Sequence, residues 1–138
     1  MSSAEARLRV RYAETDQMGV AYHANYLVWM ELGRVEWCRA AGLRYRDMEQ
    51  QDGILLVVAE AHCRYTSPAR YDDEVIVRTT VRDAHPRMVT FEYRLERAGD
   101  GVLLATGHTK HIFVGRDLVP RRLPEKYQAA FGIAARPA

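Results

Sequence analysis

Between residues 24 and 41, apolar side chains recur at the three- and four-residue spacing that places them on one face of an α-helix. Gly42 follows directly and is a natural stop for that helix. Gly33 lies inside the pattern, although glycine costs about 1 kcal/mol relative to alanine in a helix interior. We therefore expect the helix backbone to approach its packing partner closely at Gly33. The apolar face consists of Tyr26, Met30, Gly33, Trp37 and Ala41.

The rest of the chain follows the two-residue alternation of β-strands, and short turns separate its segments. The last four strands follow one another through short turns, so we expect them to be antiparallel neighbours. One helix and five such strands predict an α+β domain with two layers. The expected strands are 8–12, 54–65, 75–82, 89–96 and 102–114, with turns at 84–87 and 98–101 and a short helix at 45–51.

The segment 54–59 departs from the alternation because it is apolar on both faces. Such a strand needs cover on both sides, and one helix can cover only one face of a sheet. We therefore expect the second face to be buried against another copy of the chain.

The chain has 138 residues, enough for one domain spanning 1–138 and too few for two ordinary ones. Apolar residues make up 48% and charged residues 28%, which excludes disorder and fibrous structures. No apolar run approaches the roughly 20 residues that a membrane-spanning helix needs. The first seven residues lack the apolar stretch of a secretory signal, and Cys38 and Cys63 are too few for a disulfide framework. These features predict a reduced, cytoplasmic protein.

Twenty Lys and Arg against eighteen Asp and Glu give a net charge of +2, which is too balanced for a dedicated nucleic-acid-binding protein. The five histidines form no spacing typical of a metal site, so we expect no metal. A basic group near the C-terminus is a candidate for contacts with a phosphate-bearing ligand, and a solvated surface explains it equally well. This group comprises Lys110, His111, Arg116, Arg121 and Arg122.

The stretch 11–26 combines a carboxylate, a glycine turn, a Tyr-His pair and the start of the predicted helix. Amides exposed at a helix N-terminus can polarise a carbonyl and hold the oxyanion that forms when it is attacked. Asp16, in the loop before the helix, could act there as general base or nucleophile. The combination suits acyl transfer. Taken singly, Asp16 and Asn25 also fit turn and cap roles, and Tyr22 and His23 fit ordinary structural ones.

The same stretch resembles the signature of the hotdog-fold acyl-CoA thioesterases, in the branch of the 4-hydroxybenzoyl-CoA thioesterase and YbgC-like proteins. The matching run extends from Arg11 to Tyr26 and continues through 37–43, with weaker similarity at 64–73 and 120–124. The resemblance implies one long central helix wrapped by a curved antiparallel sheet. It also implies a homodimer with a sheet continuous across both subunits. We expect such dimers to assemble into a homotetramer, although the sequence leaves the choice between dimer and tetramer open.

The resemblance implies roles for individual residues as well. Asp16 would be the catalytic carboxylate, and the backbone N–H of His23 would polarise the thioester carbonyl. Tyr22 and the His23 side chain would lie near the reacting group, and Gly19 would shape the loop. The substrate would be an acyl-CoA, with no separate cofactor. The other candidates for substrate binding, with the basic ones facing the phosphates of CoA, are Asn25, Thr66, Ser67, Arg70, Arg121 and Arg122.

These features predict hydrolysis of an acyl-CoA to a carboxylic acid and free CoA, in which Asp16 either attacks the carbonyl or deprotonates the attacking water. One alternative is an acyl-thioester hydratase or dehydratase on the same fold, because Asp16 and His23 also suit proton transfer at carbon. Another is a non-catalytic module that binds acyl-CoA or acyl carrier protein. The identity of the acyl group stays open.

Overall fold

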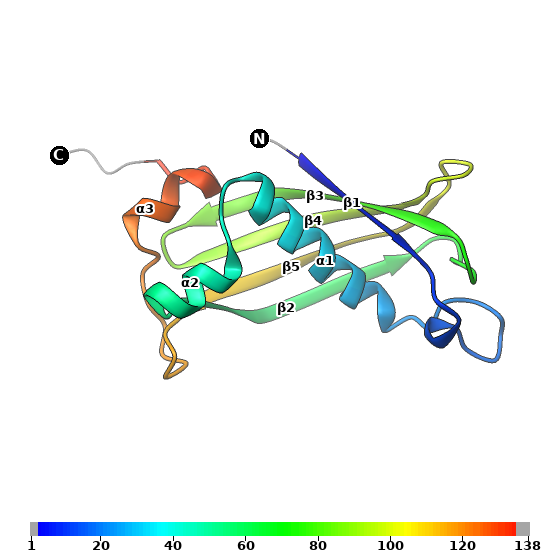
Figure 1. The fold of residues 1–138 in the computed structure, drawn as a ribbon, viewed down its shortest axis with the longest axis horizontal. Coiled ribbons are helices and arrows are strands. Elements are labelled where there is room, and N and C mark those ends of the chain that lie inside the picture. Colours follow the sequence, from blue (N-terminus) through cyan, green and yellow to red (C-terminus); the bar gives the residue numbers. More distant parts are fainter. Residues whose placement is uncertain (1–2, 135–138) are drawn as a thin grey trace.

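The structure is a computed structural model that describes residues 3–134, so Met1 and Ser2 of the N-terminal segment lie outside the described residues. Within this range the chain forms five strands, three α-helices and two short 3-10 helices (Figure 1). In chain order these are β1 (Ser3–Arg9), η1 (Tyr12–Glu14), α1 (Asn25–Ala40), α2 (Tyr45–Asp52), β2 (Leu55–Tyr65), β3 (Glu74–His85), β4 (Met88–Arg97), β5 (Leu103–Val114), α3 (Glu125–Gln128) and η2 (Ala129–Phe131).

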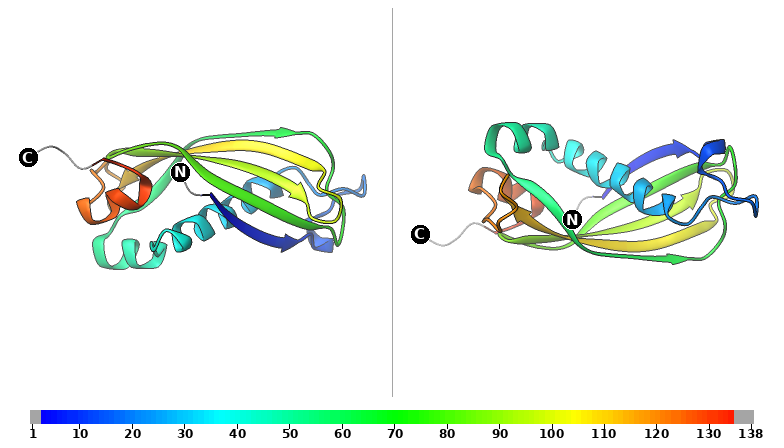
Figure 2. Two further views of the ribbon diagram at one scale, coloured as in Figure 1. Left: turned by 90° about the horizontal axis from the view of Figure 1, so that it is seen from above. Right: turned by 90° about the horizontal axis from the view of Figure 1, so that it is seen from below.

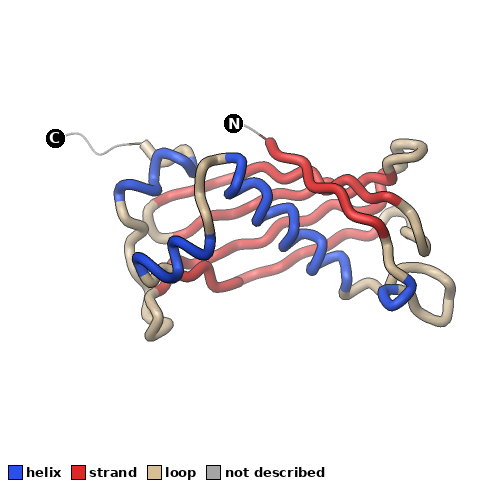
Figure 3. Tube along the Cα trace, in the orientation of Figure 1, coloured by secondary structure: helices blue, strands red, loops and turns tan. Residues whose placement is uncertain are grey.

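The five strands form one antiparallel sheet in the order β1-β3-β4-β5-β2, so β1 and β2 are its edges. The expected pairing of chain neighbours is confirmed for β3-β4 and β4-β5 and is wrong for β2-β3, because β2 crosses to the far edge and pairs with β5. Helix α1 lies across one face of this sheet (Figures 1 and 3). Figure 2 shows that α2 and α3 lie on the same side of the twisted sheet as α1. The predicted α+β class with a five-stranded antiparallel sheet is confirmed, and the predicted short helix is present as α2.

The first strand lies earlier in the chain than its alternating pattern indicates, so the predicted boundaries 8–12 are wrong. The backbone N–H of Val10 donates to Asp73 O at 2.9 Å, which ties the end of the strand to the segment before β3. The carboxylate of Glu14 then accepts a hydrogen bond from the N–H of Arg11 at 2.8 Å and closes the turn of η1. These bonds end the strand and redirect the chain toward the loop before α1.

Helix α1 packs on the sheet through the predicted apolar face. Tyr26, Met30 and Trp37 are each at most 3% exposed. A Cβ atom built on Gly33 would lie only 2.5 Å from Thr79 Oγ1 on β3, closer than real Cβ atoms approach other atoms. The close approach of helix and sheet expected at Gly33 is therefore confirmed.

Apolar residues of two elements stay exposed in the single chain. On the edge strand β2, Val57 and Val58 are 39% and 51% exposed. On α1, the side chains of Leu27, Val28 and Leu32 are between 40% and 50% exposed. The single chain thus leaves the segment that is apolar on both faces without its second cover.

Candidate active site

Asp16 lies in a tight turn between η1 and α1. Its backbone N–H donates to Val20 O at 2.9 Å, and the N–H of Gly19 donates back to Asp16 O at 3.0 Å. Gly19 has a φ of +79°, which glycine adopts without strain. The Asp16 carboxylate accepts from the N–H of Met18 at 2.9 Å through Oδ1, and no described residue donates to Oδ2. The turn therefore fixes the carboxylate and leaves one oxygen for a ligand.

Glu14 anchors both ends of this turn, a role that the sequence did not reveal. Its backbone oxygen accepts from the N–H of Tyr22 and from Nδ2 of Asn25, each at 2.8 Å. Its carboxylate accepts from Trp29 Nε1 at 2.9 Å as well as from the N–H of Arg11. Burial raises the pKa of Glu14, but the hydrogen bonds from Arg11 and Trp29 outweigh it and hold the pKa below its ordinary value. The buried carboxylate therefore stays ionised and ties the turn to α1.

Two backbone amides directly before α1, those of His23 and Ala24, have no acceptor among the described residues. The N–H of Asn25 donates to Tyr22 O at 3.0 Å, and that of Tyr26 donates to His23 O at 3.2 Å. No side chain caps the helix, and within residues 3–134 nothing accepts from the N–H of His23 or Ala24. A helix N-terminus also carries a partial positive charge. The His23 amide is therefore free to bind an oxygen of a ligand.

A pocket of about 280 Å³ opens between this turn, the start of α1 and the end of β2. Of the residues predicted from the sequence, Asp16, His23, Thr66 and Ser67 line it. Asp16 and His23, whose backbone amide is unpaired, thus line one small pocket. The other lining residues are Met18, Val20, Ala21, Tyr26, Tyr65 and Pro68.

Two tyrosines that the sequence analysis did not assign to the site form one wall of the pocket. Tyr65 Oη donates to His23 O at 3.0 Å, and Tyr26 Oη accepts from the N–H of Ala69 at 3.1 Å. Their rings meet edge to face, with centroids 5.0 Å apart. Burial, followed by the contact with Cys63, raises the pKa of Tyr65 to about 12. The Tyr65 phenol therefore stays protonated and holds the carbonyl of His23.

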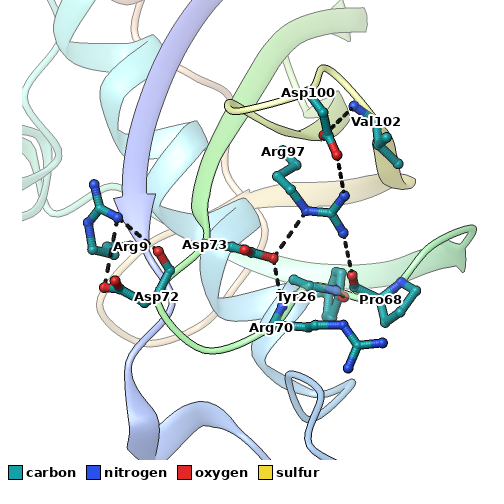
Figure 4. A network of polar contacts seen from close by, with 10 residues as sticks. Arg9, Tyr26, Pro68, Arg70, Asp72, Asp73, Arg97, Asp100 and Val102 are labelled. Atoms are coloured by element: carbon teal, nitrogen blue, oxygen red, sulfur yellow. Dashed lines mark hydrogen bonds and ion pairs between the residues drawn. The ribbon is translucent and has the colours of Figure 1, made fainter.

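Arg97 fixes the loop before β3 through the polar contacts that Figure 4 shows, and Pro68 of this loop lines the pocket. Its Nη2 donates to Pro68 O at 2.8 Å, and its Nε donates to Asp73 Oδ2 at 3.1 Å. The same Asp73 oxygen accepts from the N–H of Arg70 at 2.9 Å. The guanidinium of Arg70 points away from this network and is exposed beside the rim. The predicted segment 66–70 is thus held at the pocket mostly by its backbone.

Tyr22 and Asn25 lie next to the pocket without lining it. Tyr22 is 48% exposed, and its ring centroid lies 4.6 Å from that of His23. The side-chain amide of Asn25 donates its hydrogen bond to the backbone oxygen of Glu14. Through this bond Asn25 has a structural role, which the sequence analysis considered as an alternative to substrate binding.

Arg121 and Arg122 lie at the opposite end of the sheet from the pocket, so within one chain they do not line it, and their contact with the CoA phosphates stays a prediction. The N–H of Arg121 donates to Phe113 O at 2.9 Å at the end of β5, where β5 pairs with the start of β2. The pocket lies at the other end of β2. The basic group predicted near the C-terminus is not one surface either, because His111 is fully buried. Strand alternation sends its side chain to the core.

Within residues 3–134, no three His, Cys, Asp or Glu side chains lie close enough together to hold a metal ion. None of the described helices has the length and hydropathy to cross a membrane.

Residues 10–131 match the model of the thioesterase-like superfamily. The chain belongs to this family. It is 38% identical over 118 residues to the putative acyl-CoA thioesterase YneP of Bacillus subtilis, covering 85% of this chain and 83% of YneP. It is 30% identical over 129 residues to the acyl-CoA thioester hydrolase YbgC of Escherichia coli O6:H1, covering 90% of this chain and 92% of YbgC.

A solved structure extends this similarity to the fold of the superfamily. The DHNA-CoA thioesterase from Staphylococcus aureus superimposes with a TM-score of 0.91 at 32% identity, covering 96% of this chain and 90% of that one. These relatives confirm the family and the enzyme class predicted from the sequence, a thioester hydrolase among the hotdog-fold thioesterases.

Proposed function

We propose that this member of the thioesterase-like superfamily hydrolyses the thioester bond of an acyl-CoA in the pocket beside Asp16. One observation carries the proposal: Asp16 and His23 line the same pocket of about 280 Å³, and neither Asp16 Oδ2 nor the N–H of His23 has a partner among the described residues. A carboxylate and a polarising amide on one small pocket suit attack on a carbonyl held between them. The named activities of YneP and YbgC support acyl-CoA as the substrate class.

In the proposed reaction, the N–H of His23 and the N-terminus of α1 stabilise the carbonyl oxygen as negative charge develops on it. Asp16 either attacks the carbonyl carbon, giving a mixed anhydride that water cleaves, or removes a proton from the attacking water. In both routes the C–S bond breaks, the CoA sulfur leaves as a thiolate that takes up a proton, and the acyl group ends as a carboxylic acid. No separate cofactor takes part, because CoA belongs to the substrate.

The other residues of the site have supporting roles in this proposal. The imidazole of His23 lines the pocket beside Tyr22 and serves as a proton donor to the departing thiolate. Thr66 and Ser67 contact the part of CoA nearest the sulfur, since they line the same pocket. Arg70, exposed beside the rim, faces a phosphate of CoA.

We further propose a homodimer, paired into a homotetramer, that covers the exposed apolar residues of β2 and α1. Pairing of the two β2 edges would continue the sheet across both subunits and complete the predicted wrapping around α1. The same assembly would supply Arg121 and Arg122 from the partner to the CoA phosphates. The cysteines Cys38 and Cys63 are free thiols, which fits the predicted cytoplasmic location.

The release of free thiol from acyl-CoAs of graded chain length tests the function and identifies the acyl group. Asp16→Asn should lower kcat by about 100-fold or more, because asparagine is neither a general base nor a nucleophile. Its circular dichroism spectrum and its affinity for acyl-CoA should stay unchanged. Asp83→Asn is the matched control, since Asp83 is exposed on β3 and forms no ion pair with a described residue.

Unchanged turnover in Asp16→Asn would remove Asp16 from the mechanism. A change in enoyl absorbance without release of thiol would favour the hydratase alternative. A single turnover in heavy-oxygen water then separates the two hydrolytic routes, because label enters the Asp16 carboxylate only if the mixed anhydride forms.

A further inference from the structure

The sheet face opposite α1 carries a row of basic residues that the strand register fixes. Thr106 of β5 pairs with Arg64 of β2 on one side and with Arg94 of β4 on the other. Gly107 faces α1, since a Cβ there would lie 2.5 Å from Met30 Cε. Its neighbour Thr106 therefore points to the opposite face. The two arginines flank Thr106 at the interstrand spacing of about 4.8 Å on each side.

Carboxylates neutralise only part of this row. Arg78 of β3 pairs directly with Arg94 in the register, and like charges opposite each other are destabilising. Glu96 is shared between them: it accepts from Arg78 Nε at 2.5 Å and lies 3.4 Å from Arg94 Nε. Arg78 also pairs with Glu5 of β1 and is therefore neutralised from two sides. Arg64 forms no ion pair with any residue in 3–134. The row therefore keeps one guanidinium without a counter-ion and a second that is only partly neutralised.

A hollow of about 660 Å³ lies over this row. Its lining includes His62 and His108, which pair across β2 and β5 with ring centroids 5.0 Å apart and an interplanar angle of 13°. Glu92 is the one acidic residue among the described residues that line the hollow, and it already accepts a hydrogen bond from Arg82. The hollow thus offers guanidinium, hydroxyl and imidazole groups with no free carboxylate to repel an anion.

We propose that this hollow binds the phosphate of a small organic phosphate, held between Arg64 and Arg94 over the hydroxyl of Thr106. The planar fork of a guanidinium matches two oxygens of a phosphate, and such charge-assisted pairs are the strong ones. A phosphate dianion satisfies both arginines at once, whereas a single carboxylate supplies only one charge. The stacked imidazoles of His62 and His108 provide an adjacent flat surface for the organic part.

Two sources can supply such a phosphate. Arg64 directly precedes Tyr65, which lines the Asp16 pocket from the other face of the edge strand β2. The nucleotide end of a bound CoA is therefore one source, and this assignment rests on the proposed function. A free nucleotide is the other source, and it requires no thioesterase activity.

The test is calorimetric titration of the full chain with adenosine 3′,5′-bisphosphate and, separately, with pyrophosphate, at constant ionic strength. Arg64→Gln and Arg94→Gln should each raise the Kd for these compounds about tenfold or more, because each removes a charge-assisted pair with the phosphate. Arg46→Gln is the matched control: Arg46 is an exposed arginine of α2 without an ion pair to a described residue. Circular dichroism checks that each variant is folded.

Absence of binding to both compounds by the unmodified chain overturns the proposal, and so does an equal loss of affinity in Arg46→Gln. Hydrolysis of acyl-CoA compared with acyl-pantetheine, which lacks the nucleotide, identifies the source. If the phosphate is that of CoA, Arg64→Gln raises the KM for acyl-CoA, divided by the KM for acyl-pantetheine, about tenfold. If a free nucleotide binds instead, this ratio stays as in the unmodified chain, while the affinity measured by calorimetry falls. Failure of the proposed function has a separate signature, since neither thioester would then be hydrolysed.

Discussion

Replacement of Gly33 by alanine should destabilise the fold, although alanine is the better helix former. A Cβ at position 33 would lie 2.5 Å from Thr79 Oγ1 and 2.6 Å from Val77 Cγ1. Both are γ atoms of β-branched side chains, which are stiff about their single side-chain torsion. Overpacking of this kind costs about 1–3 kcal/mol, and two such contacts indicate the upper end of that range. The gain in helix propensity returns only about 1 kcal/mol.

We therefore expect Gly33→Ala to lower the free energy of unfolding by about 2 kcal/mol in urea denaturation. Gly99→Ala is the control, because nothing lies within 4 Å of its added Cβ and its φ is not positive. It should stay within about 0.5 kcal/mol of the unmodified chain. Adding Thr79→Ala to Gly33→Ala should recover part of the loss, which a double-mutant cycle measures. If Gly33→Ala is as stable as the unmodified chain or more stable, the inferred close contact between α1 and β3 is wrong.

Three further predictions concern the buried polar groups and the uncovered edge. Glu14→Gln should cost about 2 kcal/mol in urea denaturation, because an amide NH₂ must face one of the two N–H groups that the carboxylate accepts from; an unchanged midpoint would contradict this. Burial, followed by the charge of Arg34, lowers the pKa of His111 from 6.5 to about 3. As the pH is lowered, His111 is therefore protonated in the unfolded state before it is protonated in the folded state, and the free energy of unfolding should fall by about 2 kcal/mol between pH 6.5 and 5. His111→Asn should abolish this pH dependence, and a dependence that persists would refute its assignment to His111. Val58→Asp should dissociate the proposed dimer in light scattering, and a variant that stays dimeric would exclude β2 from the interface.

Local pattern was sufficient for α1, α2 and the strands β2 to β5, but not for β1 or the short helices η1, α3 and η2. The three- and four-residue recurrence of apolar positions predicts α1 and its buried face, and the two-residue alternation predicts the strands from β2 to β5. The start of the sheet was mispredicted because the alternation at 8–12 continues past the point where Val10 bonds to the backbone of Asp73. That bond joins residues far apart in the chain, and no local pattern records it.

The turn that carries Asp16 follows from local sequence, because Gly19 and the helix start lie within a few residues of it. The surroundings of that carboxylate depend on contacts between distant parts of the chain. Tyr65 reaches His23 across 42 positions of sequence, and Glu14 reaches Trp29 across 15. Helix and strand periods depend on neighbours along the chain, whereas a pocket depends on which elements the sheet brings side by side. For the same reason Arg121, basic and near the C-terminus, lies away from the pocket, while the register of three strands brings Arg64 and Arg94 together.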